Sequence, residues 1–341
     1  MLERAPGIFE VELHSDAMSV NEIKIFLIPG TDGGRSLMVD AGFRRRDCLK
    51  VMEKALGELG IACDMLDVFL THRHHDHCGL ASEYAHRGAR LFMNPQEDRH
   101  CSDCLYYSHS HGAAEDQPEV LRSVGITREG TPEVWNMFME ANGGKGEKQG
   151  WEFEIPGFSS IPVKEGHDFS YGAYHFKTVA LKGHTFGQMG LVDRESKVMF
   201  CADQVIEGIV PIVDTTYPEE HLLKGYFESL EHIKHDYEGF LILPAHNEPI
   251  KDTKRVVDRI VFSYLDKAEM IKGILDHGRR RLTAREVACL AYGMEAVPRS
   301  EGEFIKLKMI INKTFSCLEY LFDVDLAIRV EEEGIIYWEA P

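Results

Sequence analysis

A histidine-rich segment near residue 72 is the part of this chain whose residue types most clearly point to chemistry. It runs from Thr71 to Gly79 (THRHHDHCG) and places four histidines and one aspartate within six residues. Imidazole nitrogens and carboxylate oxygens are the donors that zinc and similar divalent ions take from proteins. So dense a set of donors is unusual for an ordinary solvated loop, and the segment therefore predicts a metal site.

The spacing His72-x-His74-x-Asp76-His77 resembles the signature of the metallo-β-lactamase superfamily, and the resemblance extends over roughly residues 5 to 250. Further elements of the family pattern match in the expected order: Asp40 in MVDAG, His184 in GHTFG, Asp203 in CAD and His246 in PAH. Five matching elements in order make the resemblance specific.

The resemblance implies a binuclear metal site. It assigns His72, His74 and His184 to one metal, and Asp76, His77 and His246 to the other. Asp203 would bridge the two ions, whereas Asp40 would orient a ligand loop without binding metal. The implied cofactors are two divalent transition-metal ions, zinc first, with iron or manganese as alternatives. A metal-bridging hydroxide would then attack the substrate, with Asp76 and Asp203 as the catalytic residues and Asp76 able to relay a proton.

Two residues close to these motifs are interpreted as non-ligands. His75 occupies a variable position of the motif, so we expect it to contact a ligand or face the pocket. Gln188 stands where many relatives carry another histidine. We therefore expect the contact that this residue makes with the metal ligands to differ from the one in those relatives.

A weaker group of donors consists of His100, Cys101, Cys104, His109 and His111. A Cys-x-x-Cys pair with flanking histidines can hold a structural zinc. The alternative, two thiols on one helical turn beside polar histidines, is favoured because the spacing fits no common zinc module.

The elements that must position these donors alternate between strands and helices. Apolar runs and alternation predict strands at Phe9–Leu13, Glu22–Ile28, Ser36–Asp40, Met65–Leu70, Tyr174–Leu181, Met189–Val192, Val198–Cys201 and Phe240–Leu243. Helical spacing predicts a helix over Cys48–Leu59. The strand that ends at Leu70 leads directly into the histidine-rich segment, which is a common way to build a rigid site.

The chain is expected to be α+β, with the four-layer αββα metallo-β-lactamase sandwich over residues 1–253. A helical insertion over about 96–160 interrupts it, with one helix near Pro118–Val124 and another from Thr131 onward. From Lys254, three helices and a closing hairpin predict a mostly helical, winged-helix-like domain over residues 254–341, whose second helix opens with a capping box at Thr283.

The insertion is interpreted as a lid that sets substrate choice. Its helix over Val134–Met139 is apolar on more than one face and must pack on two sides. Trp135 or Phe138 would line a pocket for an apolar acyl group, with Tyr106 and Tyr107 adding apolar surface and hydroxyls. In the alternative interpretation, these side chains simply pack against the C-terminal helices.

Composition excludes several classes of partner. The net charge is −18, of which −17 precedes Lys254, and so acidic a surface repels nucleic acid. The basic run Arg279–Arg281 is expected to be a solvated segment.

No apolar run is long enough to span a membrane, and the N-terminus lacks a secretory pattern, so a cytoplasmic location is expected. The eight cysteines are then expected to be free thiols.

Comparison with different members of the metallo-β-lactamase superfamily reduces the number of reactions expected of this chain. Asp203 and the missing leader argue against true β-lactamases, and Gln204 stands near where many lactonases carry a tyrosine. The cluster lacks the glutamate of the di-iron oxidoreductases. The C-terminal domain and the sequence THxHxDHCG resemble glyoxalase II-like hydrolases and acyl-CoA thioesterases, which implies hydrolysis of a small activated ester, with a thioester first. The alternatives are an endoribonuclease or phosphodiesterase, and a metal-bound regulatory protein with little turnover.

Overall fold

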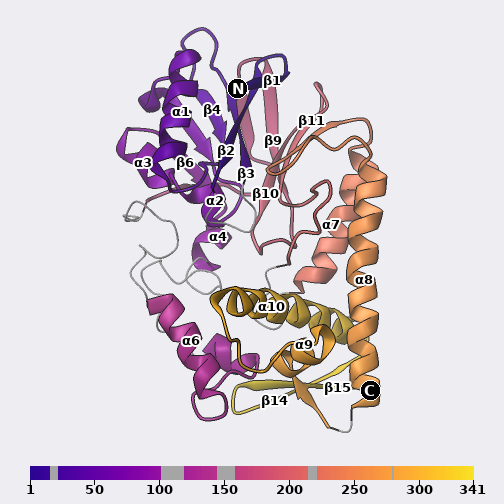
Figure 1. Ribbon diagram of the computed structural model, residues 1–341. Coiled ribbons are helices and arrows are strands. Elements are labelled where there is room, and N and C mark those ends of the chain that lie inside the picture. Colours follow the sequence, from indigo (N-terminus) through magenta and orange to yellow (C-terminus); the bar gives the residue numbers. More distant parts are fainter. Residues whose placement is uncertain (16–21, 101–118, 144–157, 214–220, 279) are drawn as a thin grey trace.

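Two sheets packed face to face form the larger part of the protein (Figure 1). The computed structural model describes residues 1–15, 22–100, 119–143, 158–213, 221–278 and 280–341. Aromatic and aliphatic side chains from both sheets, including Phe26, Phe69, Phe176 and Phe200, are buried together between them. The apolar residues that alternate along each strand therefore supply the central core of the sandwich.

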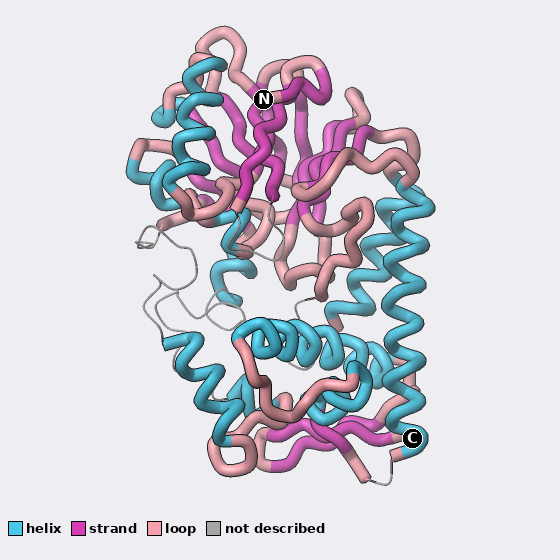
Figure 2. The backbone as a smooth tube through the Cα atoms, viewed as in Figure 1, coloured by secondary structure: helices cyan, strands magenta, loops and turns pink. Residues whose placement is uncertain are grey.

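The first sheet has seven strands in chain order. They are β1 (Leu2–Ala5), β2 (Ile8–His14), β3 (Glu22–Ile28), β4 (Ser36–Val39), β5 (Leu66–Phe69), β6 (Arg90–Met93) and β7 (Ile161–Pro162). Pairing is antiparallel from β1 to β4 and parallel from β4 to β7. Helices α1 (Arg46–Glu58) and α3 (Ala81–His86) cover its outer face, where Met52 and Tyr84 pack on the strands (Figure 2).

The second sheet has five strands in the order β12, β11, β10, β9, β8. Their bounds are β8 (Asp168–Tyr171), β9 (Tyr174–Ala180), β10 (Met189–Asp193), β11 (Val198–Ala202) and β12 (Leu241–Pro244). Only β11 and β12 run parallel, so both end at the same edge of the sheet. Helices α7 (Leu222–Asp236) and α8 (Thr253–His277) cover the outer face, which completes the expected αββα sandwich.

A mostly helical region follows the sandwich, as expected. It comprises α8, which also covers the second sheet, together with β13 (Leu282–Thr283), α9 (Ala284–Tyr292), α10 (Glu301–Asp323), β14 (Ile328–Glu332) and β15 (Ile335–Glu339). Thr283 caps α9 in the capping box expected from the sequence, with Glu286 as its partner. The three strands pair in the order β13, β15, β14 around the buried Trp338.

Helix α6 (Pro132–Gly143) corrects the interpretation of the insertion. Phe138 is fully buried, and its ring lies 4.8 Å from that of Phe304 on α10. Trp135 is half-buried against the same apolar cluster. The pocket role proposed for Phe138 is therefore wrong, because α6 buries this side chain on the C-terminal helices (Figure 1).

The predicted strands and helices agree with the structure to within about three residues at most ends. The sequence patterns missed the strands β1, β6, β7, β8 and β13, and the helices α2 (His75–Cys78), α3, α4 (Pro95–His100) and α7. Cys101, Cys104, His109 and His111 lie outside the described residues, as do Tyr106, Tyr107 and Arg279, and the side chain of His100 is likewise not described. Among the described helices, none is long and apolar enough to cross a membrane.

A buried carboxylate links the two sheets. Asp67 on β5 accepts hydrogen bonds from Arg35 (2.6 Å) and Arg90 (2.7 Å) and from the hydroxyl of Tyr171 on β8 (2.7 Å). Burial opposes ionisation, but these partners hold the pKa of Asp67 below its usual value. A charge buried between two layers is stabilised only while all of its partners remain in place.

We predict that Asp67→Asn lowers the free energy of unfolding by about 2–3 kcal/mol at pH 7, because two arginines lose their shared anion. Since the folded-state pKa is depressed, this stabilisation is complete above the unfolded pKa of about 4 and is lost as pH falls through the lower folded value. In urea unfolding, the difference in the free energy of unfolding between the parent protein and Asp67→Asn should shrink as the pH is lowered. Asp168→Asn, which removes an exposed partner of Lys177, is the matched control and should change little.

Candidate metal centre

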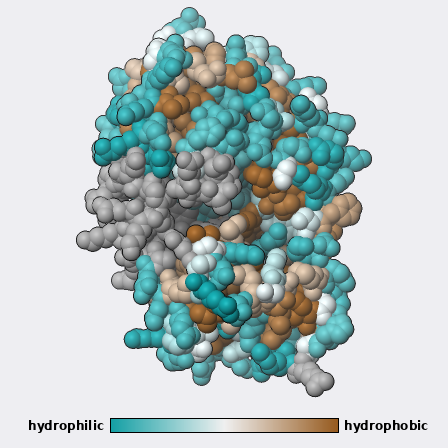
Figure 3. Space-filling model, in the orientation of Figure 1, coloured by the Kyte–Doolittle hydropathy of each residue, from teal (hydrophilic) through white to brown (hydrophobic). Residues whose placement is uncertain are grey.

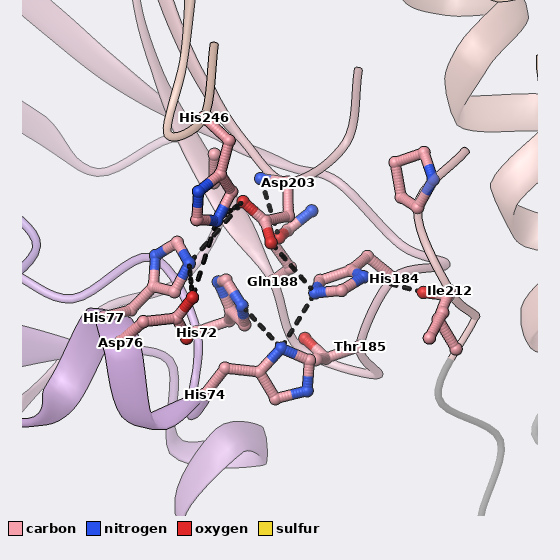
Figure 4. Close-up of polar contacts among 12 residues, drawn as sticks. His72, His74, Asp76, His77, His184, Thr185, Gln188, Asp203, Ile212 and His246 are labelled. Carbon is pink, nitrogen blue, oxygen red and sulfur yellow. Dashed lines mark hydrogen bonds and ion pairs between the residues drawn. The ribbon is translucent and has the colours of Figure 1, made fainter. Parts of the chain in front are cut away.

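The predicted ligands come from loops that leave the strands at one edge of the sandwich (Figure 4). His72 and His74 follow β5, and α2 (His75–Cys78) carries the next two donors. The other three donors, His184, Asp203 and His246, follow β9, β11 and β12 respectively. Because the strands are rigid and buried, their ends hold these side chains in defined positions.

The first cluster contains the three histidines that the resemblance assigned to one metal. His74 Nδ1 lies 3.0 Å from His72 Nε2 and 2.8 Å from His184 Nε2. Asp203 Oδ2 completes the group at 3.5 Å from His184 Nε2. All four donor atoms lie within 4.8 Å of one another, a spacing at which one metal ion can contact each of them.

The second cluster contains Asp76, His77 and His246, again as expected. Asp76 Oδ2 lies 3.5 Å from His246 Nε2 and 3.8 Å from His77 Nε2. The other oxygen of Asp203, Oδ1, lies 3.4 Å from His246 Nε2 and 3.5 Å from His77 Nε2. Asp203 therefore presents one oxygen to each cluster.

Two buried atoms at the boundary show that the residues fit a metal. His77 Nε2 and Asp203 Oδ1 are buried, and apart from contacts of 3.4–3.8 Å with other members of the two clusters, no group in the described part of the chain forms a hydrogen bond with either atom. An unsatisfied buried acceptor is costly unless an ion or water occupies the space before it. Lone pairs that converge from imidazole and carboxylate suit zinc, iron or manganese.

Asp40 supports the second cluster from behind. Its Oδ2 accepts a hydrogen bond from His77 Nδ1 at 2.8 Å, and its Oδ1 accepts from the main-chain N–H of Thr71 at 2.8 Å. The Thr71 hydroxyl also donates to Asp40 and accepts from His72 Nδ1 at 3.0 Å. These bonds fix the protons on Nδ1 and leave both Nε2 atoms free to bind metal.

Main-chain carbonyls orient two other imidazoles. His184 Nδ1 donates to the carbonyl of Ile212 at 2.7 Å, and His246 Nδ1 donates to that of Glu22 at 2.5 Å. Each bond selects the tautomer whose Nε2 faces the clusters. Gly183, just before His184, has φ +137°, and a Cβ at this position would overlap with the side chain of Tyr226.

The electrostatics of the second cluster favour a cation. Burial alone would lower the pKa of His246, but Asp203 and Asp76 raise it to about 10. The same balance of burial and nearby carboxylates raises the pKa of His77 well above its usual value. By contrast, burial and neighbouring imidazoles lower the pKa of His72. Negative potential is thus greatest where Asp76, His77 and His246 meet, and a dication would satisfy it.

Glu97 is a residue that the sequence analysis missed. It lies on α4 (Pro95–His100), is fully buried, and accepts hydrogen bonds from two ligand loops. Its Oε2 binds the N–H of Arg73 at 2.8 Å, and its Oε1 binds the Thr185 hydroxyl at 2.8 Å and the N–H of Gly187 at 2.6 Å. The carboxylate therefore joins the segment between His72 and His74 to the segment after His184. In the sequence, the only signal for Glu97 is that it is an acidic residue a few positions after the end of β6.

Gln188 behaves as expected for a residue behind the ligands. Its side-chain oxygen accepts from the N–H of Asp203 at 3.4 Å, and its amide nitrogen donates to Gln204 at 2.7 Å. His75 is half-buried and belongs to neither cluster, in keeping with its interpretation as a non-ligand. Burial lowers the pKa of its imidazole to about 4.

A profile of the metallo-beta-lactamase superfamily matches residues 23–272. The chain belongs to this superfamily, whose members are typically metal-dependent hydrolases.

Two solved structures resemble the whole chain. A metallo-beta-lactamase family protein from Thermus thermophilus has 19% identity and a TM-score of 0.71, over 99% of both chains. A beta-lactamase domain protein from Burkholderia ambifaria has 18% identity and a TM-score of 0.73, over 100% of this chain and 93% of that one. At this identity the likeness shows the fold, and it extends over the C-terminal helical region. No curated protein sequence matches the chain significantly.

We predict that Glu97→Gln weakens zinc affinity about tenfold. Both oxygens of Glu97 accept hydrogen bonds from the ligand loops, whereas the amide nitrogen of glutamine can only donate, so one set of these bonds is lost. Competition with a chromophoric chelator measures this affinity. Glu10→Gln is the matched control, since Glu10 is also buried but pairs with Arg4 and belongs to neither donor cluster. Equal zinc affinity in the two variants would show that Glu97 does not hold the ligand loops.

Proposed function

We propose that the chain is a binuclear metal-dependent hydrolase of a small activated ester, with a thioester as the first candidate. The observation that carries the proposal is the position of Asp203, whose two oxygens face different clusters of donors. One tetrahedral ion cannot use five imidazoles and two carboxylates, so the donor set suits two ions. Zinc is the preferred ion, with iron and manganese as alternatives.

The protein groups have distinct roles in this proposal. Two divalent ions, when bound, would supply activated water at neutral pH and would polarise the acyl carbonyl. Asp203 holds the two clusters at a fixed separation through one carboxylate. Burial opposes ionisation of Asp76, but His77 and His246 keep the pKa of its carboxyl below the usual value. Asp76 therefore faces the second cluster as an anion, which is the form that suits a metal ligand.

Several features support an ester over a nucleic acid as the substrate. The net charge is −18, and Figure 3 shows a largely hydrophilic surface over the sandwich. In the basic run near residue 280, Arg280 pairs with Glu286 at 2.7 Å and Arg281 with Glu332 at 2.8 Å. These guanidinium groups are already neutralised by acids, which weakens any phosphate contact. The thioester itself is supported by the motif THxHxDHCG and the C-terminal helical region.

The proposal is tested by elemental analysis of the purified protein beside a substrate panel. The panel contains acyl thioesters, lactones and phosphodiesters, the last including single-stranded RNA. We expect about two transition-metal ions per chain and turnover of thioesters that a chelator abolishes. Turnover confined to phosphodiesters would replace the substrate assignment by the nuclease alternative. Two bound metals with no turnover of any class would favour the regulatory alternative.

We predict that Asp203→Asn loses at least one metal ion and nearly all turnover, since a neutral amide cannot supply the negative charge shared by two dications. Asp193→Asn is the matched control. Asp193 is also buried, at the end of β10, but it accepts hydrogen bonds from the N–H groups of His175 and Ser196, outside both clusters. Full metal content and full turnover in Asp203→Asn would refute the bridging role.

A further inference from the structure

The carbonyl that orients His184 belongs to a loop held by the C-terminal helices. This loop follows Asp203 and reaches Val213, and Ile212 within it accepts the hydrogen bond from His184 Nδ1 (Figure 4). The carbonyl of Ile212 and the N–H of Val213 are the two polar ends of one peptide unit. Because a peptide unit is planar, fixing the direction of one end fixes the other.

Tyr264 on α8 binds the other end of this peptide unit. Its hydroxyl accepts a hydrogen bond from the N–H of Val213 at 3.0 Å and donates one to the carbonyl of Pro211 at 2.6 Å. One hydroxyl therefore binds main-chain atoms on both sides of Ile212. The chain of hydrogen bonds runs without a break from Tyr264 through the peptide unit to His184, and such chains strengthen each member.

The attachment is buried and has a second anchor on α10. Tyr264 and Val213 are both fully buried. The hydroxyl of Ser316 donates to the carbonyl of Val213 at 2.9 Å. Further along the same loop, Arg259 on α8 donates to the carbonyls of Ile206 and Ile209 at 3.0 and 3.2 Å. Two helices of the C-terminal part thus hold the loop, with no competition from water at Tyr264 and Ser316.

We propose that Tyr264 is a positioning residue for the first metal cluster. It fixes the Ile212–Val213 peptide unit so that the Ile212 carbonyl keeps the proton of His184 on Nδ1, which leaves Nε2 unprotonated and facing the first cluster. The C-terminal helices are therefore a structural part of the metal centre as well as its neighbours. The inference rests on the metal centre of the proposed function and is independent of the substrate.

The test measures the two stepwise Zn²⁺ dissociation constants of the full-length protein by competition with a chromophoric chelator. His184→Ala identifies which constant belongs to the cluster that contains His184. We expect Tyr264→Phe to weaken that constant about tenfold, the lower end of the loss seen when a partner behind a ligand is removed. The other constant, which reports Asp76, His77 and His246, should stay unchanged. Phenylalanine keeps the ring and its packing, so the comparison isolates the hydroxyl.

Tyr174→Phe is the matched control. Tyr174 is also buried, and its hydroxyl donates to the carbonyl of Pro6 at 2.7 Å, away from both clusters. This variant should bind zinc as the parent does. Unchanged constants in Tyr264→Phe overturn the inference, and so does an equal weakening of both constants, which would indicate general loosening of the fold. A parent protein that binds none of Zn²⁺, Fe²⁺ and Mn²⁺ overturns the proposed function and this inference with it.

Discussion

Buried carboxylates and imidazoles meet at one edge of the sandwich, and the surrounding structure is organised around keeping their polar atoms paired. Burying a charged or polar group without a partner costs several kcal/mol. The outer ring nitrogens of four imidazoles are bound by protein atoms, as Asp40 binds His77 and a main-chain carbonyl binds His184. The inner nitrogens and both oxygens of Asp203 face the two clusters. The fold thus generates a demand for positive charge where Asp76 and Asp203 meet the imidazoles of His77 and His246.

The donors could be found from the sequence, but the groups that orient them could not. His72 to His77 lie within six residues, so their spacing is itself the signal. Glu97 is separated by 90 positions from Gly187, which it binds, and nothing local marks it as a partner. The carbonyl of Ile212 is a main-chain atom that any residue can supply, so residue type carries no information about it. Contacts of this kind are set by tertiary packing alone.

The same limit applies to the helix of the insertion. Its apolar residues on more than one face predicted packing on two sides, but a periodicity does not identify the partner. The structure places Phe138 against Phe304 on α10, so the side chain contributes to a core shared with the C-terminal helices. Short edge elements such as β7 (Ile161–Pro162) were missed for a related reason, because two residues are too few to show alternation.

The dependence of His184 on Tyr264 and Ser316 has a consequence for the order of events during protein synthesis. The chain leaves the ribosome from its N-terminus, so the histidines near residue 72 emerge long before α8 and α10. Until those helices have been made and packed, the peptide unit at Ile212 lacks its anchors. The proposed role of Tyr264 implies that the first cluster reaches its final geometry only after α8 and α10 have been translated. Metal uptake at this cluster, as proposed above, would then be a late step of maturation, and a nascent chain interrupted before α10 would expose imidazoles without a completed site.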